Sequence, residues 1–131
     1  ELETAQGWKR LGEALIEGDP DAREWVAQTL IDFFAQPDAR VNTYRLYLVA
    51  QVVGPAETMR LLLNNPYPIN AGFVFAIWLG TDEFKALRQH EDFPKFAQRI
   101  GLVDAWQNYG WPTQCKRTPQ LTDDDPAFRC D

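Results

Sequence analysis

Apolar residues recur at intervals of three and four over most of the chain, which is the spacing of helices that bury one face. The strongest pattern runs from residue 20 to residue 36. Asp19 and Pro20 stand at its start as an N-cap and a proline in the first turn, so they predict where this helix begins. The apolar stripe comprises Ala22, Trp25, Val26, Leu30, Phe33 and Phe34, and the polar face comprises Asp21, Glu24, Gln28 and Asp32.

Shorter helices are predicted along the rest of the chain up to Gly110. Glycine, proline and asparagine interrupt the apolar patterns at short intervals and mark the connecting turns. Residues 69–79 are apolar nearly all round, so we favour a buried central helix there over a strand. The other predicted helices are 2–17, 39–53 with a seam of Val41, Tyr44, Leu48 and Val52, 55–63, and three that begin at Thr81, Asp92 and Leu102.

Short helices joined by tight turns predict an all-α fold of antiparallel helix pairs, either a tetratricopeptide-like α-solenoid or a small orthogonal bundle. The spacing of Trp8, Leu11, Gly12 and Leu15 fits the start of a tetratricopeptide repeat, W-x2-L-G-x2-Y, except at the last position. We expect residues 1–110 to form this helical domain. Residues 111–131 contain three prolines, an acidic run and both cysteines, and are expected to form an irregular tail.

Charge and composition exclude several functions. The formal net charge is −6, and nucleic acids and anionic membranes both require a basic surface, so we expect neither as a partner. The chain has no serine and a single histidine, His90, which excludes a Ser-His-Asp triad and a metal site with two histidine ligands. It has no glycine-rich phosphate loop, and its longest apolar run is far shorter than the ~18 residues of a membrane span. We therefore expect no enzyme activity, cofactor, metal or membrane span.

The two cysteines are the most informative chemical feature. Cys115 and Cys130 enclose 14 residues of the proline-rich tail. Closing a loop of this size stabilises a fold by about 3 kcal/mol in the chain-entropy model, so we favour a structural disulfide that fastens the tail. Such a bond would indicate an oxidising compartment, most simply the bacterial periplasm. The alternatives are unpaired cysteines in a reducing cytosol, half of a zinc site, and a regulatory disulfide that releases the tail on reduction.

The last third of the chain carries a spaced set of residues: Leu87-Arg88, Asp92, Phe96, Arg99, Gly101-Leu102, Trp106, Gly110-Trp111-Pro112 and Cys115. With the later acidic-aromatic ending at Cys130, this region resembles the C-terminal end of bacterial tetratricopeptide-containing regulatory proteins. Some of those proteins carry a winged-helix (ToxR-like) DNA-binding domain, and others an adenylate cyclase domain. Phe93-Pro94 and Ala105 depart from the family pattern, which has Pro-Arg and Tyr there. The resemblance implies a helical repeat domain that closes a multidomain protein, without DNA binding or cyclase activity of its own.

Aromatic side chains define a candidate partner surface. Phe73, Phe75 and Trp78, together with Trp111, would line a groove for a peptide or a partner helix, as stacked helices do in solenoids. Packing into the core is the simpler alternative. The aromatic residues that we expect in the core are Trp8, Trp25, Phe33, Phe75, Trp78, Phe96 and Trp106.

Three polar features are weaker candidates. Histidine titrates near neutral pH, which would suit a pH sensor at His90, but a solvated loop histidine is the simpler interpretation. Residues 123–125 are all aspartate, yet the glycine and glutamate of an EF-hand do not follow, so we expect a solvated loop and not a calcium site. The pairs Glu13/Glu17 and Glu24/Gln28 lie on polar helix faces and are expected to aid solubility.

These patterns predict a non-catalytic protein-interaction or sensory domain of a larger bacterial regulatory protein, which binds a protein or peptide or self-associates as a homo-oligomer. One alternative is a small-molecule sensor with an apolar cavity near Phe73, Phe75 and Trp78. Another is the structural cap of a longer repeat array, which would expose an apolar face on the first helix. We expect a periplasmic or otherwise exported location, with the cytoplasm as the alternative. Because the chain begins with Glu1 and not Met, we expect it to be a piece of a longer protein.

Overall fold

A computed structural model of the protein describes residues 1–39, 42–64 and 71–131. Within these residues the chain forms eight α-helices and one two-stranded antiparallel sheet, so the prediction of a mainly helical fold is confirmed. The helices α1 and α3 each continue directly into a π-helical turn. The elements are α1 (Ala5–Gly12), η1 (Glu13–Glu17), α2 (Pro20–Phe34), α3 (Thr43–Leu48), η2 (Val49–Val53), α4 (Pro55–Asn64), α5 (Ala71–Ala76), α6 (Asp82–Gln89), α7 (Phe93–Arg99), α8 (Leu102–Tyr109), β1 (Cys115–Arg117) and β2 (Phe128–Cys130).

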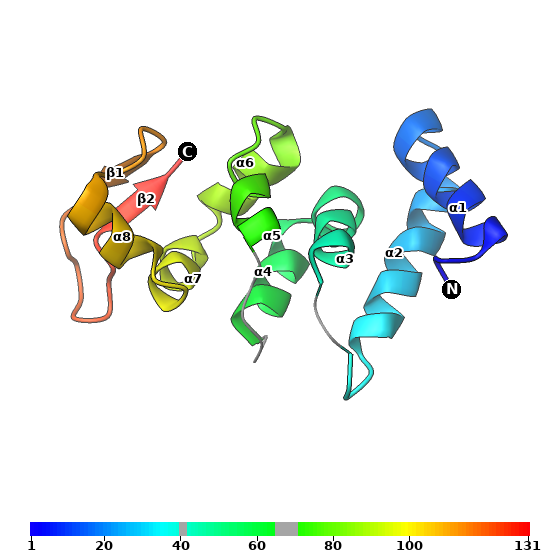
Figure 1. The fold of residues 1–131 in the computed structure, drawn as a ribbon, viewed down its shortest axis with the longest axis horizontal. Coiled ribbons are helices and arrows are strands. Elements are labelled where there is room, and N and C mark those ends of the chain that lie inside the picture. The colour runs from blue at the N-terminus through cyan, green and yellow to red at the C-terminus, as the bar shows by residue number, and fades with distance from the viewer. Residues whose placement is uncertain (40–41, 65–70) are drawn as a thin grey trace.

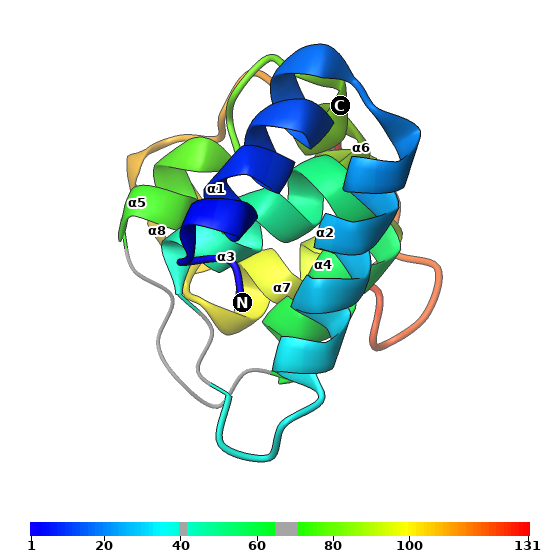
Figure 2. The same ribbon diagram turned by 90° about the vertical axis from the view of Figure 1, so that its right-hand side faces the viewer.

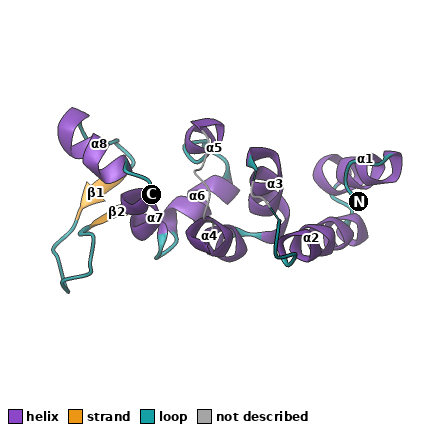
Figure 3. Cartoon of the chain, turned by 60° about the horizontal axis from the view of Figure 1, so that its bottom comes forward, coloured by secondary structure: helices purple, strands orange, loops and turns teal. Residues whose placement is uncertain are grey.

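The helices follow one another in sequence order along the long axis of the molecule, from α1 and α2 at one end to the strands at the other (Figure 1). The helices α1, α3 and α5 lie in one row, and α2, α4 and α7 lie in a second row (Figure 3). Seen along the long axis, α1 and α2 lie in front of the other helices (Figure 2). The main contacts join near neighbours in the chain: α1 packs on α2, η2 packs on α2 and α4, and α4 packs on α6 and α7.

Capping side chains determine where the first helices begin. Thr4, Asp19 and Asn42 each accept a hydrogen bond from the backbone N–H three residues later, at 3.0, 2.8 and 2.8 Å. The predicted start at Asp19 and Pro20 is confirmed, because Asp19 is the N-cap of α2 and Pro20 its first residue. The cap at Asn42 also explains why α3 begins at Thr43, later than the sequence pattern indicated.

Arg23 joins the first helix pair to the next one. From α2, its guanidinium donates hydrogen bonds to the carbonyl oxygens of Ala14 at 3.4 Å and Gln51 at 2.9 Å. These carbonyls belong to η1 and η2, where the π-helical turn shifts the backbone hydrogen-bond ladder. One side chain thereby holds three elements in contact.

The buried aromatic side chains of the core, among the described residues, all come from the second half of the chain. Phe73 and Phe84 are fully buried, with ring centroids 6.4 Å apart, and Phe93 lies 6.1 Å from Phe96. The expectation that Phe96 belongs to the core is therefore confirmed.

Two other core predictions are wrong: Trp8 is 56% exposed and Phe75 is 75% exposed. Residues two apart in a helix point about 200° apart, so α5 buries Phe73 and exposes Phe75. The segment is amphipathic and not buried all round as predicted. Of the predicted helix positions, residues 40–41 and 69–70 lie outside the described residues.

The tail is irregular only in part, because β1 and β2 pair as a short hairpin with Cys115 opposite Cys130. The backbone N–H of Asp131 donates to the carbonyl oxygen of Gln114 at 2.8 Å. This bond makes Gln114 and Asp131 a hydrogen-bonded pair. Hydrogen-bonded and non-hydrogen-bonded pairs alternate along an antiparallel ladder, so the next pair, Cys115 and Cys130, is not hydrogen-bonded, and side chains approach most closely in pairs of this kind. The predicted disulfide joins Cys115 and Cys130 at this position.

Apolar contacts also hold the hairpin. Phe128 is fully buried, and its ring lies 5.6 Å from that of Trp106 and 5.1 Å from that of Trp111. Trp106 in turn contacts Trp78 at 5.8 Å. We call these four residues the hairpin anchor. They join β2 and α8 to the turn that follows α5.

Arg88 is a buried charged residue, 5% exposed, next to the hairpin. Its guanidinium donates to the carbonyl oxygens of Ile77 and Leu79 at 2.8 Å each and of Asp131 at 2.7 Å. Burial lowers the pKa of Arg88, although the three carbonyl acceptors compensate for the lost water. The side chain connects α6 to the end of α5 and to the end of β2.

Candidate functional site

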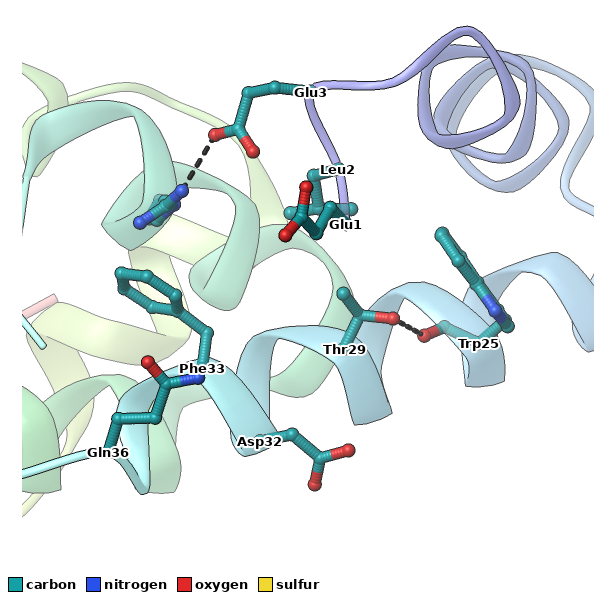
Figure 4. Close-up of a pocket in the computed structure, with 9 residues that line it drawn as sticks. Glu1, Leu2, Glu3, Trp25, Thr29, Asp32, Phe33 and Gln36 are labelled. Carbon is teal, nitrogen blue, oxygen red and sulfur yellow. Dashed lines mark hydrogen bonds and ion pairs between the residues drawn. The ribbon is translucent and has the colours of Figure 1, made fainter.

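A groove with a volume of about 630 Å³ runs along one face of α2 (Figure 4). Four residues of α2 form one side together with Gln36, which follows the helix, and the sequence spacing of the four places them within an arc of about 100°. The N-terminal segment (residues 1–3) and α3 form the other side. The lining residues are Glu1, Leu2, Glu3, Trp25, Thr29, Asp32, Phe33, Gln36 and Arg45.

A close backbone approach positions the N-terminal segment. A Cβ atom on Gly7 would lie only 2.2 Å from the carbonyl oxygen of Leu2, so the segment can lie against α1 only because residue 7 is glycine. The Thr4 hydroxyl donates to the carbonyl oxygen of Glu1 at 3.0 Å and accepts from the N–H of Gly7. Leu2 is buried, and the carboxylates of Glu1 and Glu3 are left at the edge of the groove.

One end of the groove holds a guanidinium. Arg45 lies with its Cζ atom 3.6 Å from the centroid of the Phe33 ring and donates to the Glu3 carboxylate at 2.8 Å. This hydrogen bond lowers the pKa of Glu3 below its ordinary value. Aromatic face and carboxylate together are a recognised environment for a cationic side chain.

The rest of the groove carries negative charge without a cationic partner. The lining contains three carboxylates, Glu1, Glu3 and Asp32, against the single guanidinium of Arg45. Asp32 accepts a hydrogen bond from the neutral amide of Gln28 at 2.7 Å. Among the described residues, neither Asp32 nor Glu1 forms an ion pair. Counted over side chains alone, the groove therefore has an excess of two negative charges.

Aromatic side chains occupy both ends of the groove. Trp25 and Phe33 rise from α2 toward the N-terminal segment, with Thr29 between them, whereas the Asp32 side chain points away from that segment (Figure 4). Close to the groove, the ring of Trp8 lies 6.2 Å from that of Tyr44 and joins α1 to α3. Partial burial and the nearby Glu3 carboxylate raise the pKa of Tyr44.

The four residues predicted as a partner surface have different environments. Phe73 is fully buried and cannot contribute to a surface, since its ring packs on Phe84. Trp78 and Trp111 are half-buried members of the hairpin anchor. Phe75 is the one strongly exposed member of the four. None of these four residues lines the groove on α2.

The weaker polar candidates have local structural contacts. The Nδ1 atom of His90 accepts from the N–H of Asp92 at 3.1 Å. Asp125 accepts from the N–H groups of Ala127 at 2.9 Å and Leu121 at 3.2 Å, and these bonds lower its pKa. Within the described ranges no three His, Cys, Asp or Glu side chains are placed to hold a metal ion.

Sequence reasoning did not identify Glu3, Asp32, Phe33 and Arg45 as one site. The helical pattern placed Phe33 in the apolar stripe of α2 and Asp32 on its polar face, and the groove lies at the border between the two. A usable signal is an aromatic pair eight residues apart, Trp25 and Phe33, at the edge of a stripe and beside an acidic residue. The contribution of Arg45 depends on how α3 packs, which spacing within one helix cannot indicate.

None of the helices in the described part of the chain combines the length and apolar character that crossing a bilayer requires. Comparisons of the chain with protein-family models, with curated proteins and with solved structures found no significant match.

Proposed function

We propose that this chain is a non-catalytic interaction domain that binds a segment of another protein, or a peptide, in the groove along α2. The observation that carries the proposal is the form of the groove: it extends along one helix face, has aromatic side chains at both ends and has polar and charged side chains along its length. Grooves of this form suit peptide segments, whose side chains pack on the aromatic residues and whose backbone stays close to solvent.

The arrangement of the helices supports a finer proposal. Two rows of helices that follow sequence order along one axis are expected of a tetratricopeptide-like α-solenoid, in which the partner lies across stacked helices (Figure 3). Several residues that carry the family resemblance, Arg88, Trp106, Trp111 and Cys115, meet around the hairpin. We accordingly propose a repeat domain of a larger bacterial regulatory protein. The disulfide supports an exported, periplasmic location.

A displayed library of random peptides tests the binding function. Selected peptides are synthesised and titrated into isotope-labelled protein, and we expect saturable NMR shifts at the Trp25 indole and at the backbone amides of Thr29 and Gln36. Phe33→Ala should weaken binding by about tenfold or more, because aromatic anchors dominate such interfaces. Failure to select any peptide that saturates the groove would overturn the proposal.

Phe75→Ala is the matched control for Phe33→Ala. It removes the same side chain from a 75% exposed position outside the groove, so peptide affinity should stay within about twofold. If Phe75→Ala and not Phe33→Ala abolished binding, the partner surface would lie on α5, as the sequence indicated, and the groove would be the wrong site.

A second candidate function is the structural cap of a longer repeat array. Trp8, Gly12 and Ile16 are four residues apart along α1 and η1, Ile16 is 86% exposed, and open space lies beside Gly12. A preceding helix pair would cover such a face. The test compares amide hydrogen exchange of residues 5–17 in this chain and in a longer protein that contains this chain together with preceding repeats. Equal exchange rates would count against the cap.

A further inference from the structure

We propose that the segment bound in the groove carries an arginine or lysine whose charge is met by Asp32, next to an apolar side chain that packs on Trp25. This inference rests on the peptide-binding function proposed above and specifies the chemistry of the partner. It follows from three observations on the lining of the groove.

The first observation is that the groove already binds a cation of its own. The Arg45 guanidinium lies between the Phe33 ring, at 3.6 Å, and the Glu3 carboxylate, at 2.8 Å. The lining therefore offers the two kinds of group that stabilise a cationic side chain at a partly solvated site. Because Arg45 occupies this end, a second cation would bind toward the other end.

The second observation is that the other end has the same kinds of group without a cation. Trp25 offers a half-buried ring, and Asp32 and Glu1 offer carboxylates that no described cationic side chain neutralises. Trp25 and Asp32 are seven residues apart in α2, so they lie within about 20° of the same face, about 10 Å along the axis. This span matches a few residues of a bound segment, with one side chain on the ring and another at the carboxylate.

The third observation is the sign of the charge. An acidic segment would meet three carboxylates against one guanidinium among the groove side chains, and a chain of net charge −6. A neutral segment would cover carboxylates without replacing the water that they lose. A basic segment avoids both costs, and the overall charge also accelerates its association.

Three blocked peptides test the inference. They alternate leucine with arginine, with glutamine or with glutamate, and each is titrated into isotope-labelled full chain at physiological ionic strength. We expect the arginine peptide to bind with shifts at the Trp25 indole and the Asp32 amide, the glutamine peptide to bind about tenfold more weakly, and the glutamate peptide not to bind.

A charge-reversal pair separates the groove from general attraction by an acidic protein. Asp32→Lys should weaken binding of the arginine peptide by about tenfold or more and improve binding of the glutamate peptide. Glu24→Lys makes the same charge change at an exposed position of α2 outside the groove, and we expect an effect below about twofold. Equal effects of the two variants would overturn the inference, because binding would then follow net charge alone.

The outcomes distinguish this inference from the function on which it rests. If all three peptides, or library-selected peptides without basic residues, saturated the groove equally well, peptide binding would stand and the preference for a cation would be wrong. If no peptide of any charge shifted the groove resonances, both would fail. Preference for the arginine peptide, lost in Asp32→Lys and kept in Glu24→Lys, would support both.

Discussion

The N-terminal segment and the C-terminal hairpin are both non-helical pieces of chain that lie against helices, but different contacts hold them. Residues 1–3 are held by one buried side chain, Leu2, and by an ion pair between Glu3 and Arg45 in which the Glu3 side chain is 51% exposed. The hairpin is held by a fully buried Phe128, a disulfide and the hydrogen bonds of Arg88. The N-terminal segment borders an aromatic-lined groove of about 630 Å³, whereas the aromatic side chains at the hairpin pack on one another, and the pocket of about 490 Å³ beside its loop has no aromatic lining residue. Binding surfaces commonly lie in the less tightly packed part of a domain.

Among the variants that test this contrast, removal of the buried Phe128 ring should lower the free energy of unfolding most. We expect Phe128→Ala to lower the free energy of unfolding by about 3–5 kcal/mol, because it leaves a cavity beneath Trp106 and Trp111. Urea unfolding followed by tryptophan fluorescence measures it. Leu121→Ala, at an 81% exposed position of the same hairpin, should change the free energy by less than about 0.5 kcal/mol. Similar losses in both variants would show that the ring is not the main anchor.

Removal of the disulfide should have the next largest effect. The double variant Cys115→Ala/Cys130→Ala should lose about 3 kcal/mol in urea unfolding, the value for a closed loop of this size. We expect the hairpin to persist in the native state, since Phe128 and Arg88 still hold it. Reductant should not affect the double variant. Loss of the β1 and β2 amide protection without unfolding of the helices would instead indicate a latch that reduction opens.

Arg88→Met should destabilise the protein by about 1–3 kcal/mol. Methionine retains much of the side-chain length but leaves the carbonyl oxygens of Ile77, Leu79 and Asp131 without their donor. Thermal unfolding, together with hydrogen exchange of the β2 amides, measures the loss and its location. A fully stable variant would mean that water replaces the guanidinium at no cost.

Loss of the ion pair between Glu3 and Arg45 should have the smallest effect on stability, and this effect should depend on pH. The folded protein lowers the pKa of Glu3 below the usual glutamate value of about 4.3, so the pair contributes stability above that pH and loses it as the pH falls through the lowered pKa. At neutral pH, Glu3→Gln should cost at most about 1 kcal/mol, because the carboxylate is half exposed. The difference from wild type should vanish in acid. A difference that grew in acid would contradict the assigned pairing, and Glu24→Gln serves as the control without an ion pair.

Local features were predictable from sequence where one short segment contains their cause. The start of α2 at Asp19 and Pro20 depends on a cap within three residues, and the disulfide depends on two cysteines in one short tail. The hairpin was missed because prolines and aspartates dominate residues 119–126, and the alternating apolar pattern of a strand is too short to detect in three residues.

Features that depend on packing between helices were not predictable. Phe75 lies in an apolar run, yet its direction from α5 is fixed by the neighbours that bury Phe73. The burial of Arg88 depends on three carbonyl groups 9, 11 and 43 residues away. The groove likewise requires residues 1–3, α2 and α3 to meet, which no periodicity within one helix encodes.

The position of the disulfide has a consequence for protein chemistry. Residues 119–124 are exposed, and the covalent bond closes this loop into a ring. A protease that cuts the loop once therefore releases no fragment, and the chain becomes heavier by one water while its two pieces stay together until a reductant separates them. Nicked protein that stays in one piece and is heavier by one water would thus identify the loop as the cleavage site, whereas a cut in a connection between helices produces pieces that no covalent bond joins.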